Sequence, residues 1–142
     1  MRTHPYLRAY MAGIVVPTVF LLCAMTIYAV YRFYLEVPSQ FVFGIPAAPL
    51  ERMIMFPMAV VPNLWGVWNM LYLRLKPRLP LPAFGALLPM LLVPLMITLG
   101  RAFDAFHVQI GLALMAIPVG MALYYLVWKF AVGFLNDEMG IG

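Results

Sequence analysis

Few side chains in this sequence are equipped for chemistry, and the most informative of them is Asn63. It lies midway between Arg52 and Arg74, in a stretch without another charged residue. A side-chain amide both donates and accepts hydrogen bonds, so Asn63 is a candidate contact for a substrate or an ion. The other candidate residues for such a path are Thr18 and Gly66. The alternative role for Asn63 is a hydrogen bond to a neighbouring helix, worth about 0.6–2 kcal/mol in model systems.

The residues that catalysis or metal binding would require are scarce. Cys23 is the single cysteine, which excludes an internal disulfide and a cysteine-based metal site. The two histidines, His4 and His107, do not supply the pair that would hold a haem between helices. No Asp or Glu lies inside the long uncharged stretches, so the usual carboxylate proton relay is missing. We therefore expect no catalytic residue, no metal and no cofactor, and the chain is not predicted to be an enzyme.

The candidate residues must be positioned by unusually apolar elements, since 65% of the 142 residues are hydrophobic. Four long stretches carry no Lys, Arg, Asp or Glu: 9–31, 53–73, 79–100 and 105–128. A helix needs about 20 apolar residues to cross a bilayer, and it satisfies its own backbone there. The pattern predicts an all-α integral membrane bundle and excludes a soluble domain, a disordered chain and a nucleic-acid-binding protein. The predicted spans, in a single domain 1–142, are about 9–31, 53–73, 83–100 and 106–128.

A proline preceded by Val or Ile recurs in each predicted span. The four are Pro17, Pro62, Pro94 and Pro118. Proline removes a backbone donor and clashes with the preceding turn, so we expect four proline-kinked helices. The segments 57–62 and 89–94 also match each other in part, which leaves an internal inverted duplication open beside simple compositional recurrence.

Basic residues indicate the orientation, because positively charged short loops stay in the cytoplasm. The N-terminal segment carries Arg2 and Arg8, and the loop after the second span carries Arg74, Lys76 and Arg78 without an acid. Both segments fall on the same side of a four-span chain. We therefore expect cytoplasmic N- and C-termini, in a bacterial inner (plasma) membrane.

The outer loop, residues 32–52, contains an uncharged stretch at 37–50. The stretch is too short to cross a bilayer, and three prolines prevent a continuous helix. Two interpretations stay open: an interfacial or re-entrant segment that lines a path, and a loop folded over the outer ends of the helices.

Helical spacing gives the second span two different faces. The small and polar face is expected to pack against other helices, and the bulky face to meet lipid. The first comprises Ala59, Asn63, Gly66 and Met70, and the second Val61, Trp65, Trp68 and Tyr72. Small residues four apart also predict close helix approach, at Ala9/Gly13 and Ala116/Gly120.

These features predict a small multi-pass membrane protein that is a channel or transporter subunit, with a mid-membrane polar site around Asn63. A bundle of 142 residues is thin for enclosing a path alone, so we expect a homo-oligomer. The alternative is a non-catalytic structural or accessory subunit of a membrane complex. The expected partners are the lipid bilayer and further copies or a larger membrane complex, with no nucleic acid.

Overall fold

The computed structural model describes residues 4–34, 41–42, 45–76, 78–102 and 110–141. Nearly all of this described part is helical. The elements in chain order are α1 (Pro5–Ala29), the π-helical turn η1 (Val30–Tyr34), β1 (Phe41–Val42), β2 (Ile45–Pro46), α2 (Ala47–Leu75), α3 (Leu81–Ala86), α4 (Leu88–Ala102), α5 (Ile110–Val127), the π-helical turn η2 (Trp128–Val132) and α6 (Gly133–Glu138).

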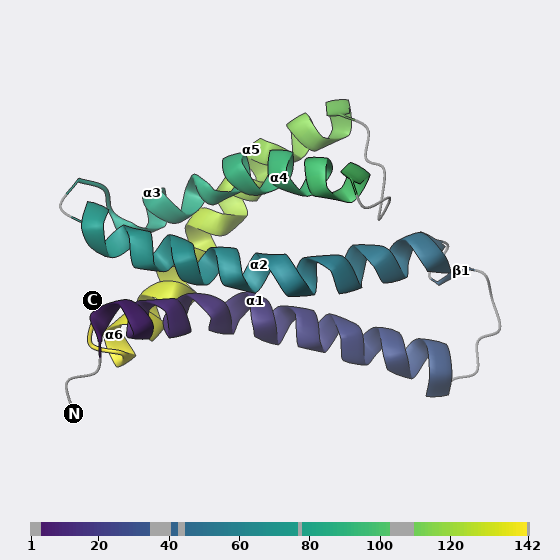
Figure 1. Cartoon of the computed structure of the whole chain (residues 1–142), viewed down its shortest axis with the longest axis horizontal. Helices are drawn as coiled ribbons and strands as arrows, with labels where there is room; N and C mark the ends of the chain where they lie inside the picture. The colour runs from purple at the N-terminus through teal and green to yellow at the C-terminus, as the bar shows by residue number, and fades with distance from the viewer. Residues whose placement is uncertain (1–3, 35–40, 43–44, 77, 103–109, 142) are drawn as a thin grey trace.

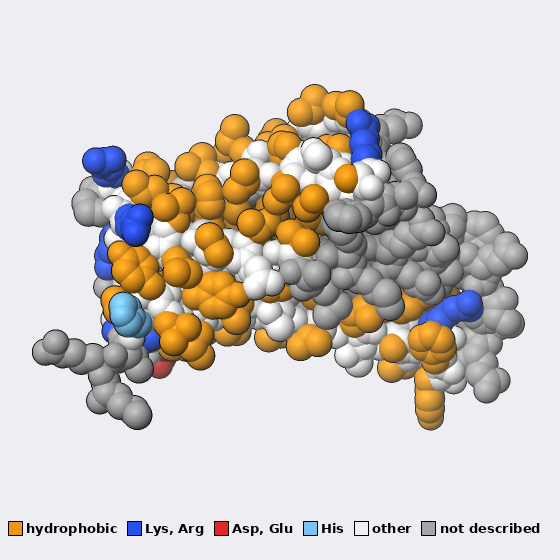
Figure 2. Space-filling model, viewed as in Figure 1, with side chains coloured by type: hydrophobic (Ala, Val, Ile, Leu, Met, Phe, Trp, Pro, Cys, Tyr) orange, Lys and Arg blue, Asp and Glu red, His pale blue; other side chains and the backbone are white. Residues whose placement is uncertain are grey.

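Three helical segments in the described part are long and apolar enough to cross a membrane. They are Pro5–Tyr34, Leu81–Ala102 and Leu114–Glu138. Figure 2 agrees with a membrane setting, because Lys and Arg side chains gather at the two ends of the face in view. Between these ends, the described side chains are mostly hydrophobic. The protein is therefore a membrane protein whose described residues are helical apart from one short strand pair.

Helix α2 occupies the middle of the molecule. It runs antiparallel to α1 along one side, and α3 and α4 lie on its other side (Figure 1). Helix α5 packs against α3 and α4, and the chain then continues through η2 into α6, which reaches the beginning of α1. The last predicted span, expected to end at residue 128, thus continues as helix to Glu138.

The helices continue through the prolines that were expected to kink them. Pro17, Pro94 and Pro118 lie inside α1, α4 and α5, and Pro62 lies inside α2. The helical segment Leu81–Ala102 is interrupted once, at Leu87 between α3 and α4, and another proline, Pro89, lies two residues after this break. Pro89 has no N–H to donate to the carbonyl four residues back. The neighbouring bonds tighten to a spacing of three residues, from Leu87 N–H to Phe84 O and from Met90 N–H to Leu87 O.

The expected interfacial or re-entrant segment is described only in part. Phe41 pairs with Pro46 and Val42 with Ile45 in a short antiparallel hairpin. Helix α2 begins directly afterwards at Ala47. Positions 37–40 and 43–44 lie outside the described residues.

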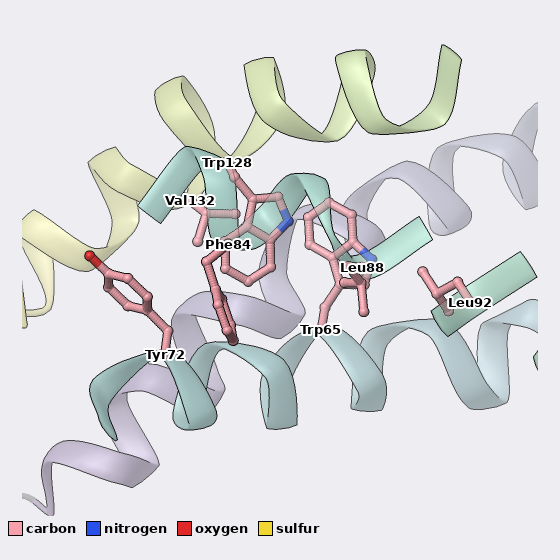
Figure 3. Packing of buried hydrophobic residues seen from close by; sticks show 7 residues of the cluster. All are labelled: Trp65, Tyr72, Phe84, Leu88, Leu92, Trp128 and Val132. Atoms are coloured by element: carbon pink, nitrogen blue, oxygen red, sulfur yellow. The ribbon is translucent and has the colours of Figure 1, made fainter. Parts of the chain in front are cut away.

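The largest hydrophobic core is aromatic and gathers around the side of α2 that faces α3 (Figure 3). Its buried members are Trp65, Tyr72, Phe84, Leu88, Leu92, Trp128 and Val132. Trp68 also packs against it, with its ring stacked 4.7 Å from Phe84. The prediction that the bulky face of the second span meets lipid is therefore wrong. Trp65 and Tyr72 on this face are buried by the aromatic core, whereas Asn63 on the small and polar face is exposed.

Gly85 allows this core to close. The indole of Trp128 lies directly over it, so that a Cβ at position 85 would overlap Trp128 Cγ. Trp128 is fully buried, and its Nε1 has no hydrogen-bond partner. The ring contacts of Trp128 with Trp65 and Phe84 offset the energetic cost of this unsatisfied donor.

We predict that Gly85→Ala destabilises the protein by about 1–3 kcal/mol, the usual range for overpacking a core. Thermal unfolding in mild detergent, followed by tryptophan fluorescence, measures the change. Gly111→Ala is the matched control, since a Cβ there meets nothing within 4 Å. Equal stability of the two variants would contradict the proposed contact.

Candidate functional site

Asn63 lies on the surface of α2 and forms a polar pair with α1. Its side chain is exposed, and its Oδ1 accepts a hydrogen bond from the Tyr10 hydroxyl. The ring of Tyr10 covers Gly66, where a Cβ would stand only 2.5 Å from Tyr10 Cδ2. Gly66 therefore provides the space that lets Tyr10 reach Asn63. We call Asn63 and Tyr10 the polar pair.

Thr18 is not brought into this arrangement by any of these contacts. It is half-buried on α1, about two helical turns beyond Tyr10. The structure thus brings together two of the three candidate residues, Asn63 and Gly66, around Tyr10, which was not among the predicted site residues.

The expected close approach at Ala9 and Gly13 is confirmed. Ala9 is fully buried, and a Cβ on Gly13 would lie 2.6 Å from Trp65 O and 2.9 Å from Gly66 Cα. Backbones of α1 and α2 are therefore nearly in contact. The second small pair behaves differently, because Ala116 is exposed.

A second asparagine, Asn69, forms the most extensive buried polar network in the described part of the chain. Its Nδ2 donates to Ala9 O at 2.8 Å and to Asn136 Oδ1 at 2.7 Å. Asn136 Nδ2 donates back to Asn69 Oδ1 at 3.2 Å. Asn69 is 0% exposed and Asn136 is 2% exposed. We call this set the Asn69 network; it joins α1, α2 and α6.

The sequence alone gave little sign of the Asn69 network. Asn69 is close to Arg74, so it could be explained as an interfacial residue. Asn136 lies beyond Lys129, the residue that ends the last uncharged stretch. The available signal was the apolar character of residues 130–135, which extends a helix past the single lysine.

The end of α6 is fixed by backbone geometry and by two cations. Gly140 adopts φ +66°, and Ile141 N–H bonds to Asn136 O at 2.9 Å, as in a Schellman motif. Arg8 Nη1 donates to Met139 O at 2.7 Å, and Lys76 Nζ donates to Ile141 O at 3.3 Å. Cations at this position interact favourably with the carbonyls at a helix C-terminus. Arg8 and Lys76, which also indicate the membrane orientation, therefore connect the end of α6 to α1 and to the end of α2.

The described residues offer no grouping suited to a metal. No three or more His, Cys, Asp or Glu side chains among them come together as a metal site. The chemistry available at the polar pair is hydrogen bonding by an amide and a phenol.

We predict that Asn69→Leu lowers the free energy of unfolding by about 1–3 kcal/mol, because it leaves buried partners unsatisfied. Adding Asn136→Leu should cost little more, since both partners are then apolar. Chemical unfolding of the single and double variants measures this coupling. Asn63→Leu, at the exposed amide, is the control. Additive losses at positions 69 and 136 would show that the two amides act independently.

We predict that Gly140→Ala loosens α6, because a residue with a Cβ in the left-handed region costs roughly 1–2 kcal/mol. Hydrogen exchange of the amides in α6 should become faster, while exchange in the middle of α2 should stay unchanged. Gly111→Ala again provides the matched control. Unaltered exchange in α6 would mean that the Schellman turn does not hold this helix.

Comparison of the chain with protein-family models, with curated proteins and with solved structures finds no match.

Proposed function

We propose that this protein is a subunit of a homo-oligomeric channel or transporter whose solute path passes the polar pair, Asn63 and Tyr10. The single observation that carries the proposal is the exposed amide of Asn63, hydrogen-bonded to Tyr10, in the middle of an uncharged stretch. Polar side chains at this depth of a membrane mark bundle interiors or water-filled paths rather than lipid. A second copy, or a path between copies, would cover the pair.

Four crossings with both termini in the cytoplasm form part of the same proposal. Helix α2 has 29 residues, so at 1.5 Å per residue it exceeds the roughly 30 Å hydrocarbon core. It runs antiparallel to α1, which supports counting it with the three apolar spans. The contact between Arg8 and Met139 O supports termini on one side, and the basic loop at 74–78 supports the cytoplasm of a bacterial inner membrane.

The solute class proposed is small, polar and uncharged. The four long stretches contain no Lys, Arg, Asp or Glu, so no side-chain charge would compensate an ion at depth. An amide and a phenol exchange hydrogen bonds with hydroxyl or amide groups. Glycerol, urea and a monosaccharide are suitable probes.

We predict that liposomes containing the protein take up at least one of these probes faster than empty liposomes, and that Asn63→Leu removes the difference. Stopped-flow light scattering measures the volume recovery. Thr98→Val is the control, because the Thr98 hydroxyl bonds to Pro94 O within its own helix. Absence of uptake, or uptake that Asn63→Leu leaves unchanged, would sink the proposal.

A non-catalytic structural or accessory subunit of a membrane complex is the second candidate. One observation favours it: α5 presents large apolar side chains around much of its circumference. Exposed members are Leu114, Met115, Val119, Leu123, Tyr125 and Leu126. Such a helix is suited to packing against a helix of another subunit as well as against lipid. An absence of flux for all probes, with a stable oligomer or complex in mild detergent, would favour this candidate.

A further inference from the structure

An apolar groove of about 300 Å³ opens between three helices on the side of α2 opposite the polar pair. Its lining comes from α1, α2 and α5 and includes Val16, Phe20, Val61, Trp65, Leu123 and Tyr124. We call it the α1–α2–α5 groove. The exposed fractions of Phe20 and Leu123, 71% and 57%, make these side chains its outer rims, and Trp65, at 4%, its floor.

The depth of the groove restricts what fills it. Val61 and Trp65 lie on either side of Asn63, in the middle of the uncharged stretch 53–73. Val16 and Phe20 belong to a segment long and apolar enough to cross a membrane. The surrounding medium at this depth is therefore hydrocarbon.

Water is a poor occupant of this groove. A site holds water when it offers two to four polar partners. The groove offers fewer than that, because its lining is almost entirely apolar and its two polar side chains, Trp65 and Tyr124, bond to each other, from Trp65 Nε1 to the Tyr124 hydroxyl at 3.3 Å. An empty groove would forfeit the dispersion contacts of its lining, so a hydrocarbon group is the favoured occupant.

The side chains of the lining also favour a lipid chain over a helix of another copy as the occupant of the groove. Helices that associate in membranes use small residues to bring their backbones together. Gly13 and Gly66 already serve the contact between α1 and α2, whereas the groove is lined by large side chains. A narrow, flexible hydrocarbon chain fits such a slot better than a helix.

We infer that the α1–α2–α5 groove is a binding site for one acyl chain of a membrane phospholipid. The chain lies against Trp65 between the rims formed by Phe20 and Leu123. A lipid held in this way remains with the protein when the surrounding lipids are exchanged. The site is separate from the polar pair, so it stands or falls independently of the proposed transport.

Quenching of Trp65 by phosphatidylcholine with bromine in the middle of one acyl chain tests the inference in reconstituted vesicles. A Trp68→Phe background leaves Trp65 and the fully buried Trp128 as the indoles. We expect strong quenching of Trp65 in this background. Val16→Phe fills the groove and should remove most of the quenching, whereas Val15→Phe should leave it unchanged. Val15 is the neighbouring exposed residue outside the groove lining.

Native mass spectrometry after detergent exchange supplies a second readout. Wild-type protein and Val15→Phe should each retain a phospholipid, and Val16→Phe should lose it. Leu123→Ala removes one rim and should increase the quenching of Trp65, which covers the case in which Val16→Phe fails to fold. Equal quenching and equal lipid retention in all variants would overturn the inference.

A second copy in the groove is the remaining outcome. Leu21→Cys in a Cys23→Ser background places a single thiol at the groove, since Leu21 is also part of its lining. Efficient disulfide cross-linking between copies at this position would show that a helix of a neighbouring subunit, and not a lipid chain, occupies the groove.

Discussion

The buried hydrogen bonds of Asn69 hold together parts of the chain that lipid would not drive together. Lipid tails are as apolar as leucine, so helices in a membrane gain little from hydrophobic burial and depend on close packing and hydrogen bonds. Asn69 bonds to the backbone of α1 and to Asn136 of α6. One amide thereby sets how three helices meet, and Arg8 and Lys76 act on the same end of the molecule.

Helix α2 depends on two different kinds of contact on its two sides. Toward α1 the contact is between backbones, made possible by Gly13 and Gly66. Toward α3 and η2 it is between aromatic rings, where Trp65 lies 5.6 Å from Trp128 and Tyr72 lies 5.6 Å from Phe84. The groove lies beside Trp65, whose ring packs 4.9 Å from that of Tyr124 on α5.

Much of the fold follows from the sequence, because an uncharged apolar stretch of bilayer length has few alternatives to a helix. The close approach at Ala9 and Gly13 could also be predicted, since small residues four apart in a membrane helix allow a neighbouring helix to pack closely. The orientation of Trp65 and Tyr72 could not, because in a membrane both lipid and protein accept an aromatic ring. Helical spacing identifies a face of α2 but does not say what covers it.

The candidate site was predictable only in the residues that α2 contributes. Asn63 and Gly66 share a face by spacing, and the structure adds Tyr10, which no spacing within one helix relates to them. Asn69 lies five residues from Arg74, a position at which an amide can also contact lipid headgroups, so the sequence alone does not mark it as buried. Its partner lies 67 positions away in sequence, and local patterns carry no information about such a contact.

This separation along the chain has a consequence for biosynthesis. Asn69 is synthesised 67 residues before Asn136, so for that interval its amide lacks the partner that Asn136 supplies. The last turns of helix must fold back onto the first before the network is complete. The packing of α1 and α2 around Asn69 is thus completed only after α6 has been synthesised. Until then the membrane contains a polar amide with one hydrogen-bond partner missing, which is energetically costly.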